Sequence, residues 1–152
     1  DESMPLERLH YWKANFLRAV SDDAIELLVE AATTMPSPTA LVILQQMHGA
    51  ASRVSSSATA FAQRHEQYNF EVISNWTDPA DSEKNIKWTH ASWAAMQPFV
   101  EQNVYVNNLL EEEGEAGVRA AYGPNYARLM ELKNKYDPTN FFRVNHNIKP
   151  TE

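Results

Sequence analysis

Three polar side chains that could do chemistry stand at alternating positions in two segments of the sequence. Tyr105 and Asn107 fall on the polar side of a period-two pattern across residues 103–107. Glu71 falls on the polar side of a similar pattern across residues 68–76. A phenol or a carboxylate can move a proton, and a carboxamide offers both a donor and an acceptor. These are the first candidates for a site, although a carboxylate on a sheet face is more often solvated or paired.

The familiar motifs of nucleotide, metal and nucleophile chemistry are absent from the sequence. Its four glycines fit neither a Walker loop nor a dinucleotide-binding pattern. Without cysteine, there can be no disulfide scaffold, thiol nucleophile or cysteine-held iron–sulfur cluster. The five histidines lack the spacing of a helical metal pair, and no GxSxG elbow occurs. We therefore predict no metal site, and the acidic run Glu111–Glu113 is more typical of a solvated loop.

Helical spacing of apolar residues predicts three helices, over residues 21–34, 81–97 and 115–135. Ser21, followed by two aspartates, provides an N-cap and an acidic first turn. The pair Gly123-Pro124 interrupts the third helix, since proline suits the first turn of a new helical piece. The positions of the first helix that we expect to face the core are Ile25, Leu28 and Ala32.

Period-two alternation predicts three strands, over residues 40–48, 68–76 and 103–107. The segment 40–48 is the most apolar of the three, which predicts a central place in the sheet. Each of the other two has one apolar face, as expected where helices cover a single side of a sheet. We therefore predict an α+β fold in which helices pack on one face of an antiparallel sheet, leaving the polar face free to meet a ligand or another element.

The composition is typical of one soluble globular domain. The 152 residues, 43% of them apolar, can bury a core without disulfides or a structural metal. A net charge of −7 with no run of basic residues argues against nucleic acid as a partner. The longest aliphatic run, residues 40–44, is too short to span a membrane, and the first residues lack the features of a signal peptide. No membrane partner is expected, and the compartment stays open.

The segment 135–150 carries the sequence KYDPTNFFRVNHNIKP, which resembles the C-terminal signature of FAD-linked oxidases of the berberine bridge enzyme type. These enzymes belong to the vanillyl-alcohol-oxidase-like flavoproteins. The tripeptide Tyr105-Val106-Asn107 resembles the Tyr-x-Asn strand of that family. Further segments that resemble the family, mainly its bacterial members, are residues 48–54, 59–61, 76–79 and 121–129. The resemblance covers essentially the whole chain from about residue 10.

The resemblance implies a division of the chain and a missing partner. Residues 1–100 would belong to a substrate-binding domain, and residues 101–152 would form the closing segment packed on it. The flavin-binding domain that precedes these regions in the family, with the His and often Cys that attach FAD, is not in the sequence. Either the chain, which begins at Asp1, is an excised fragment, or the flavin domain is supplied by another chain or lost. By itself the chain is expected to be inactive.

The resemblance also implies roles for the polar residues. In the family, the face that carries Tyr105 and Asn107 covers the flavin ring, with the substrate between sheet and flavin. Tyr105 is then the candidate base, Glu71 a weaker acid–base candidate, and Asn107 a contact to the flavin edge or the substrate. Asn145 and Asn147 would line the cofactor near its ring, with turn capping as the alternative.

The predicted function is that of the substrate-domain portion of an FAD-dependent oxidase. Hydride would pass from an alcohol, sugar or amine carbon to flavin, which O2 reoxidises. The implied partners are an N-terminal FAD-binding domain, in cis or lost, a small-molecule substrate and O2. Two alternatives stay open: a stand-alone ligand-binding module without a cofactor, and a dehydrogenase of the same family that uses another acceptor.

Overall fold

The computed structural model describes residues 8–151, which divide into two compact units. The first unit combines residues up to 46 with residues 67–101, and the second combines residues 47–66 with the chain from residue 102 onward. The first contains the sheet and two long helices, and the second contains two shorter helices and the C-terminal segment. The functional division at residue 100 implied by the resemblance stays a prediction.

The first unit is built on a three-stranded antiparallel sheet with the order β1-β3-β2. Its strands are β1 (Leu9–Leu17), β2 (Leu41–Met47) and β3 (Gln67–Trp76). β1 pairs with β3 along its whole length, from Leu9 opposite Trp76 to Leu17 opposite Tyr68. The sheet confirms the predicted α+β class and the strands predicted at residues 40–48 and 68–76.

The place of β2 in the sheet differs from the prediction, because β2 lies at an edge and β3 is central. An apolar composition indicates burial but does not identify the neighbouring strand, and Leu44 in β2 is in fact exposed. In β3 even polar positions such as Asn69 and Asn75 are buried, at 4% and 3% exposure. β1 was not predicted, because Lys13 and Asn15 interrupt its apolar pattern.

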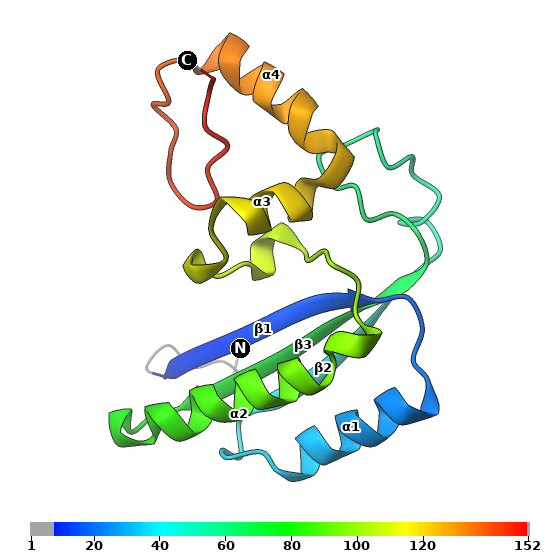
Figure 1. The fold of residues 1–152 in the computed structure, drawn as a ribbon, viewed down its shortest axis with the longest axis vertical. Coiled ribbons are helices and arrows are strands. Elements are labelled where there is room, and N and C mark those ends of the chain that lie inside the picture. Colours follow the sequence, from blue (N-terminus) through cyan, green and yellow to red (C-terminus); the bar gives the residue numbers. More distant parts are fainter. Residues whose placement is uncertain (1–7, 152) are drawn as a thin grey trace. The chain divides into compact units, whose positions relative to one another are not determined.

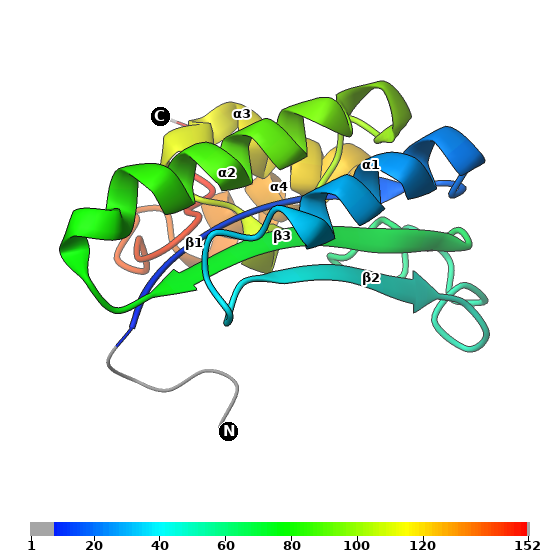
Figure 2. The same ribbon diagram turned by 90° about the horizontal axis from the view of Figure 1, so that it is seen from below.

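Helices α1 (Asp22–Thr33) and α2 (Ser82–Ala95) cover one face of the sheet (Figures 1 and 2). They confirm the helices predicted over residues 21–34 and 81–97. Ser21 caps α1 by accepting a 3.3 Å hydrogen bond from the backbone N–H of Ala24. α1 turns Ala24, Leu28 and Ala31 inward.

The predicted inward positions Ile25 and Ala32 of α1 were wrong by one residue each. Ile25 is 46% exposed, and Ala32 is exposed as well. Both phases satisfy a helical period, but the small side chains of Ala24 and Ala31 allow the helix to approach its neighbours closely. The periodicity therefore predicted the helix but not its rotation.

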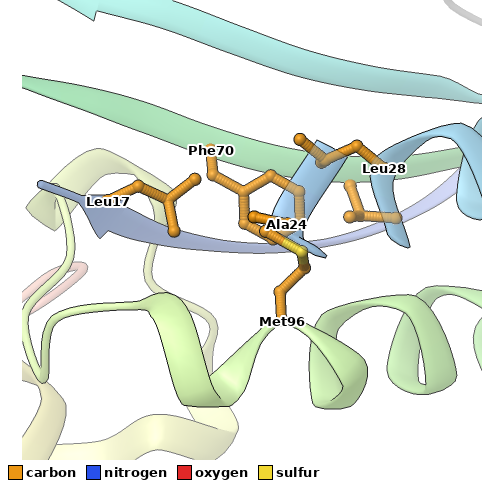
Figure 3. Close-up of a cluster of buried hydrophobic side chains, with 6 residues drawn as sticks. Leu17, Ala24, Leu28, Phe70 and Met96 are labelled. Atoms are coloured by element: carbon orange, nitrogen blue, oxygen red, sulfur yellow. The ribbon is translucent and has the colours of Figure 1, made fainter. Parts of the chain in front are cut away.

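The core of the first unit lies between the sheet and the two helices (Figure 3). Its buried members are Leu17, Ala24, Leu28, Phe70, Val72 and Met96. Phe70 and Leu17 have no exposed surface. Polar contacts accompany this apolar cluster, since the hydroxyls of Ser74 in β3 and Thr89 in α2 lie 2.6 Å apart. Together these contacts fix α2 on the sheet.

The second unit contains α3 (Gly114–Tyr122) and α4 (Tyr126–Tyr136), separated by a 3₁₀ turn at Gly123–Asn125. This confirms the interrupted helix predicted over residues 115–135. Gly123 adopts a φ of +51°, which glycine tolerates better than other residues and which redirects the chain. No helix in the described part of the chain has the length and apolar character that crossing a membrane requires.

The strand predicted over residues 103–107 is wrong. The chain is extended up to Tyr105 and then forms the 3₁₀ turn Val106–Asn108. The N–H of Asn108 donates to the carbonyl of Tyr105 at 2.8 Å, so this backbone bond is satisfied within the turn. The predicted alternation of buried and exposed side chains holds for Val104, which is buried, and Tyr105, which is exposed.

We expect Phe70→Ala to destabilise the first unit by about 3–5 kcal/mol, because the removed ring leaves a cavity in a core with no exposed surface at this position. All four tryptophans lie in this unit, so urea unfolding followed by tryptophan fluorescence reports on it. Ile25→Ala, on the exposed side of α1, is the matched control and should cost about 0.5 kcal/mol or less. Equal losses in the two variants would contradict this description of the core.

Candidate functional site

Tyr105 and Asn107 are in direct contact. The turn Val106–Asn108 returns the Asn107 side chain towards Tyr105, and Asn107 Nδ2 donates to Tyr105 Oη at 2.7 Å. Both residues are exposed, Tyr105 by 36%. The sequence pattern predicted that these side chains share a face, whereas the structure joins them through a tight turn.

The hydrogen bond between these residues has a defined chemical consequence. A phenol oxygen can accept one N–H while its own hydrogen points elsewhere. Tyr105 can therefore direct its hydroxyl hydrogen to a molecule at its exposed side while the Asn107 amide holds the oxygen.

An aromatic ring and a guanidinium lie next to this pair in the second unit. The Phe61 ring meets the Tyr105 ring edge to face, with centroids 5.5 Å apart at an angle of 86°. Arg64 lies over the Phe61 ring, with 4.8 Å from its Cζ atom to the ring centroid. Asn103 Nδ2 donates to Gln63 Oε1 at 2.9 Å, which links the residues before Tyr105 to the segment that carries Phe61 and Arg64.

Sequence reasoning did not identify Phe61 and Arg64 as site residues. Residues 53–60 are polar or small and exposed, so this stretch resembles an ordinary solvated loop. Phe61 lies 44 positions before Tyr105, and no local pattern predicts a contact over that separation. The one available signal was that residues 59–61 belong to the segments that resemble the family.

Glu71 lies in β3, in the first unit, on the side of the strand opposite the core residues Phe70 and Val72. Asn69 Nδ2 donates to Glu71 Oε1 at 2.6 Å and orients the carboxylate. Asn69 is 4% exposed, and its Oδ1 atom has no hydrogen-bond partner among the described residues. A buried acceptor without a partner is costly to the folded state.

Asp137 fastens the last part of the closing segment, which follows α4, to the end of that helix. The Asp137 carboxylate accepts the N–H groups of Phe141 at 2.7 Å and Phe142 at 3.0 Å, and it pairs with Lys133. The hydrogen bond from Lys133 lowers the pKa of Asp137 from its ordinary value, and the two backbone N–H groups lower it further against an opposing effect of burial. Asp137 therefore shapes the turn that follows α4 within the closing segment.

Asn145 and Asn147 lie further along this segment, in a turn of their own. Asn145 has a φ of +62°, and its carbonyl accepts the N–H of Asn147 at 2.9 Å. Asn147 lines a groove of about 410 Å³ against α4, together with Tyr122 and His146. Burial raises the pKa of Tyr122. Within the described residues, no hydrogen bond joins either asparagine to the Tyr105 pair.

Comparison with known proteins shows which family the chain resembles. Residues 104–149 match the family described as berberine and berberine like. An FAD-linked oxidoreductase of Dictyostelium discoideum is 30% identical over 156 residues, which cover all of this chain and 33% of that protein. An uncharacterized FAD-linked oxidoreductase of Bacillus subtilis is 37% identical over 103 residues, which cover 68% of this chain and 23% of that protein.

Solved structures share the fold. Berberine bridge enzyme from Eschscholzia californica superimposes with a TM-score of 0.87 at 22% identity, over 95% of this chain and 34% of that one. A glycopeptide hexose oxidase complexed with teicoplanin gives a TM-score of 0.80 at 24% identity, over 93% of this chain and 32% of that one.

The chain therefore belongs to the berberine bridge enzyme-like family of FAD-linked oxidoreductases and corresponds to a C-terminal portion of its members. It spans about a third of the length of the Dictyostelium discoideum protein and of berberine bridge enzyme. The homologues contain an FAD-binding domain N-terminal to this region.

The residues described here fit one part of an FAD site. Tyr105 and Asn107 offer exposed donors and acceptors in the second unit. Such groups suit the alternating donors and acceptors of a flavin ring or the polar groups of a substrate. The diphosphate usually needs a glycine-rich turn, which the sequence lacks. The fit is therefore to the ring and substrate side.

The ion pair of Asp137 gives a pH prediction. Because the folded-state pKa of Asp137 lies below its unfolded value, its contribution to stability is present above the unfolded pKa and is lost as pH falls through the folded one. The closing segment should stay fastened between about pH 5 and 8 and loosen only in stronger acid. NMR titration of the Asp137 carboxyl carbon measures this, and Lys133→Met should raise the midpoint. An unchanged midpoint in that variant would contradict the assigned cause.

Proposed function

We propose that the chain forms the substrate side of the active site of an FAD-dependent oxidase that acts on an alcohol, sugar or amine carbon. The observation that carries the proposal is the 2.7 Å hydrogen bond between Asn107 and the Tyr105 phenol, inside the segment that matches the family. Bound FAD would accept a hydride from the substrate and pass its two electrons to O2, which with two protons gives H2O2.

Tyr105 is the base in this proposal. As the substrate carbon loses hydride, the attached hydroxyl or amine must lose a proton, and the exposed phenol oxygen can take it once it is ionised. Asn107 supports this role by donating an N–H to the Tyr105 oxygen, which holds that oxygen in place. The same amide keeps its carbonyl oxygen for the substrate or the flavin edge.

Glu71 is the second acid–base candidate. The 2.6 Å hydrogen bond from Asn69 orients its carboxylate. Asn145 and Asn147 would lie near the cofactor through the closing segment. The φ of Asn145 supports a turn-forming contribution, while Asn147 at the groove offers its side-chain amide.

A flavin-binding domain is the partner that this proposal requires. Homologues carry such a domain N-terminal to the region described here. We propose that it binds most of the FAD, including the diphosphate, while this chain supplies the shape of the substrate pocket and the base. The experiments below therefore use the full-length flavin-containing protein.

Tyr105→Phe should slow anaerobic flavin reduction by about 10²–10⁴-fold, the usual value of a positioned acid or base, with the flavin content unchanged. Stopped-flow absorbance measures the reduction. Tyr11→Phe is the matched control, because Tyr11 bonds His90 on the side of the sheet that the helices cover. Reduction at the wild-type rate in Tyr105→Phe would reject Tyr105 as the base, and a comparable loss in Glu71→Gln alone would transfer that role to Glu71.

Asn107→Ala should slow flavin reduction by about 10-fold or weaken flavin binding, because the Tyr105 oxygen loses the N–H donor that holds it. Both quantities can be followed on one sample, by flavin absorbance after dialysis and by stopped-flow reduction. Asn134→Ala is a suitable control, since Asn134 bonds Thr151 at the surface. If Asn107→Ala changes neither quantity, Asn107 serves the turn alone.

A further inference from the structure

Phe61 is the residue through which the loop 47–66 reaches the candidate base. Its ring edge packs against the Tyr105 ring at 86°, a geometry that favours aromatic pairs. The contact lies on the ring of Tyr105, and the Asn107 amide holds the hydroxyl at the other end. Two contacts from different segments therefore act on the phenol, one at its hydroxyl and one at its ring. The sequence pattern predicted only that Asn107 shares a face with Tyr105, and it did not predict the contact with Phe61.

Arg64 contacts both the backbone and the ring of Phe61. Its Nε atom donates to the Phe61 carbonyl at 3.2 Å, its Nη2 atom donates to Thr59 Oγ1 at 2.7 Å, and its guanidinium lies 4.8 Å from the centroid of the Phe61 ring. A longer contact of 3.5 Å reaches the carbonyl of Ala51. A planar guanidinium can make these contacts at the same time, whereas a lysine ammonium cannot reproduce the arrangement.

Asn125, at the junction of α3 and α4, fastens the same loop from another side. Its Nδ2 group donates to the carbonyls of Ser56 at 2.6 Å and Thr59 at 3.0 Å. Asn125 is 9% exposed, whereas residues 53–60 are all exposed. An exposed loop without a core of its own loses its shape readily, so these specific polar contacts are what gives Phe61 a fixed position.

We propose that Phe61 and Arg64 are positioning residues for Tyr105. Through them the loop 47–66 fixes the Tyr105 ring so that the phenol is oriented towards the substrate. The inference rests on the proposed function, in which Tyr105 is the base. Proton transfer requires the base within hydrogen-bond reach of the proton it accepts. A displacement of about 1 Å can cost about 10²-fold in rate, so a ring contact that fixes the phenol acts on the reduction step.

The test uses Phe61→Leu and Arg64→Lys in the full-length flavoprotein. Phe61→Leu keeps an apolar side chain but removes the ring edge, and Arg64→Lys keeps the charge but removes the planar fork. Each should lower the rate constant of flavin reduction by about 10- to 100-fold, while KM changes by about 2-fold or less. Phe61→Tyr, which retains the ring, should restore a rate near that of the wild type.

Arg128→Lys is the matched control. Arg128 lies on the exposed surface of α4 in the same unit and pairs with Glu131 at 3.0 Å. An exposed pair of this kind contributes little, so this variant should reduce its flavin at the wild-type rate. Melting temperature and flavin content are measured for every variant, and if Phe61→Leu does not fold, Arg64→Lys carries the test.

A double-mutant cycle separates positioning from a general structural effect. If Phe61 and Arg64 act through the phenol hydroxyl, adding either substitution to Tyr105→Phe should change the rate by about 2-fold or less. The full 10- to 100-fold loss appearing again in the Tyr105→Phe background would overturn the positioning role while leaving Tyr105 as the base. An unchanged rate in the single variants would overturn it as well. Tyr105→Phe reducing at the wild-type rate would instead reject both proposals.

Discussion

One backbone hydrogen bond, from the N–H of Asn108 to the carbonyl of Tyr105, determines the geometry of the candidate site. In a continued strand, side chains two residues apart point the same way but are separated by about 6.5–7 Å along the chain. The 3₁₀ turn shortens this separation, so the Asn107 amide reaches the Tyr105 hydroxyl. The turn fixes the hydroxyl end of Tyr105 through Asn107, and the contact with Phe61 acts on its ring.

The two units hold their candidate residues in different ways. The first has a packed core around Phe70 and a central strand that is buried almost throughout, which gives Glu71 and Asn69 a rigid backbone. The second combines buried apolar residues, such as Val104 and Val118, with polar contacts, such as those of Asn125 with its loop and of Asp137 with the residues that follow α4.

Local signals predicted the elements, and contacts distant in sequence were not predictable in the same way. Ser21 and Gly123-Pro124 act within one turn, so their consequences for α1, α3 and α4 followed from the sequence. The inward face of α1 did not, because its period allows two phases. The alternation at Tyr105 and Asn107 predicted a shared face for the wrong reason, since a turn and not a strand joins them. Phe61 was missed because its partner is 44 positions away.

The central claim is that the Tyr105 phenol faces the reacting atom of a substrate on the ring side of FAD. A crystal structure of the full-length flavoprotein with a bound substrate analogue tests this most directly. The account predicts the Tyr105 hydroxyl within about 3 Å of the hydroxyl or amine of the analogue, with the Asn107 amide still donating to it. An analogue bound elsewhere, or a Tyr105 hydroxyl directed away from it, would contradict the account.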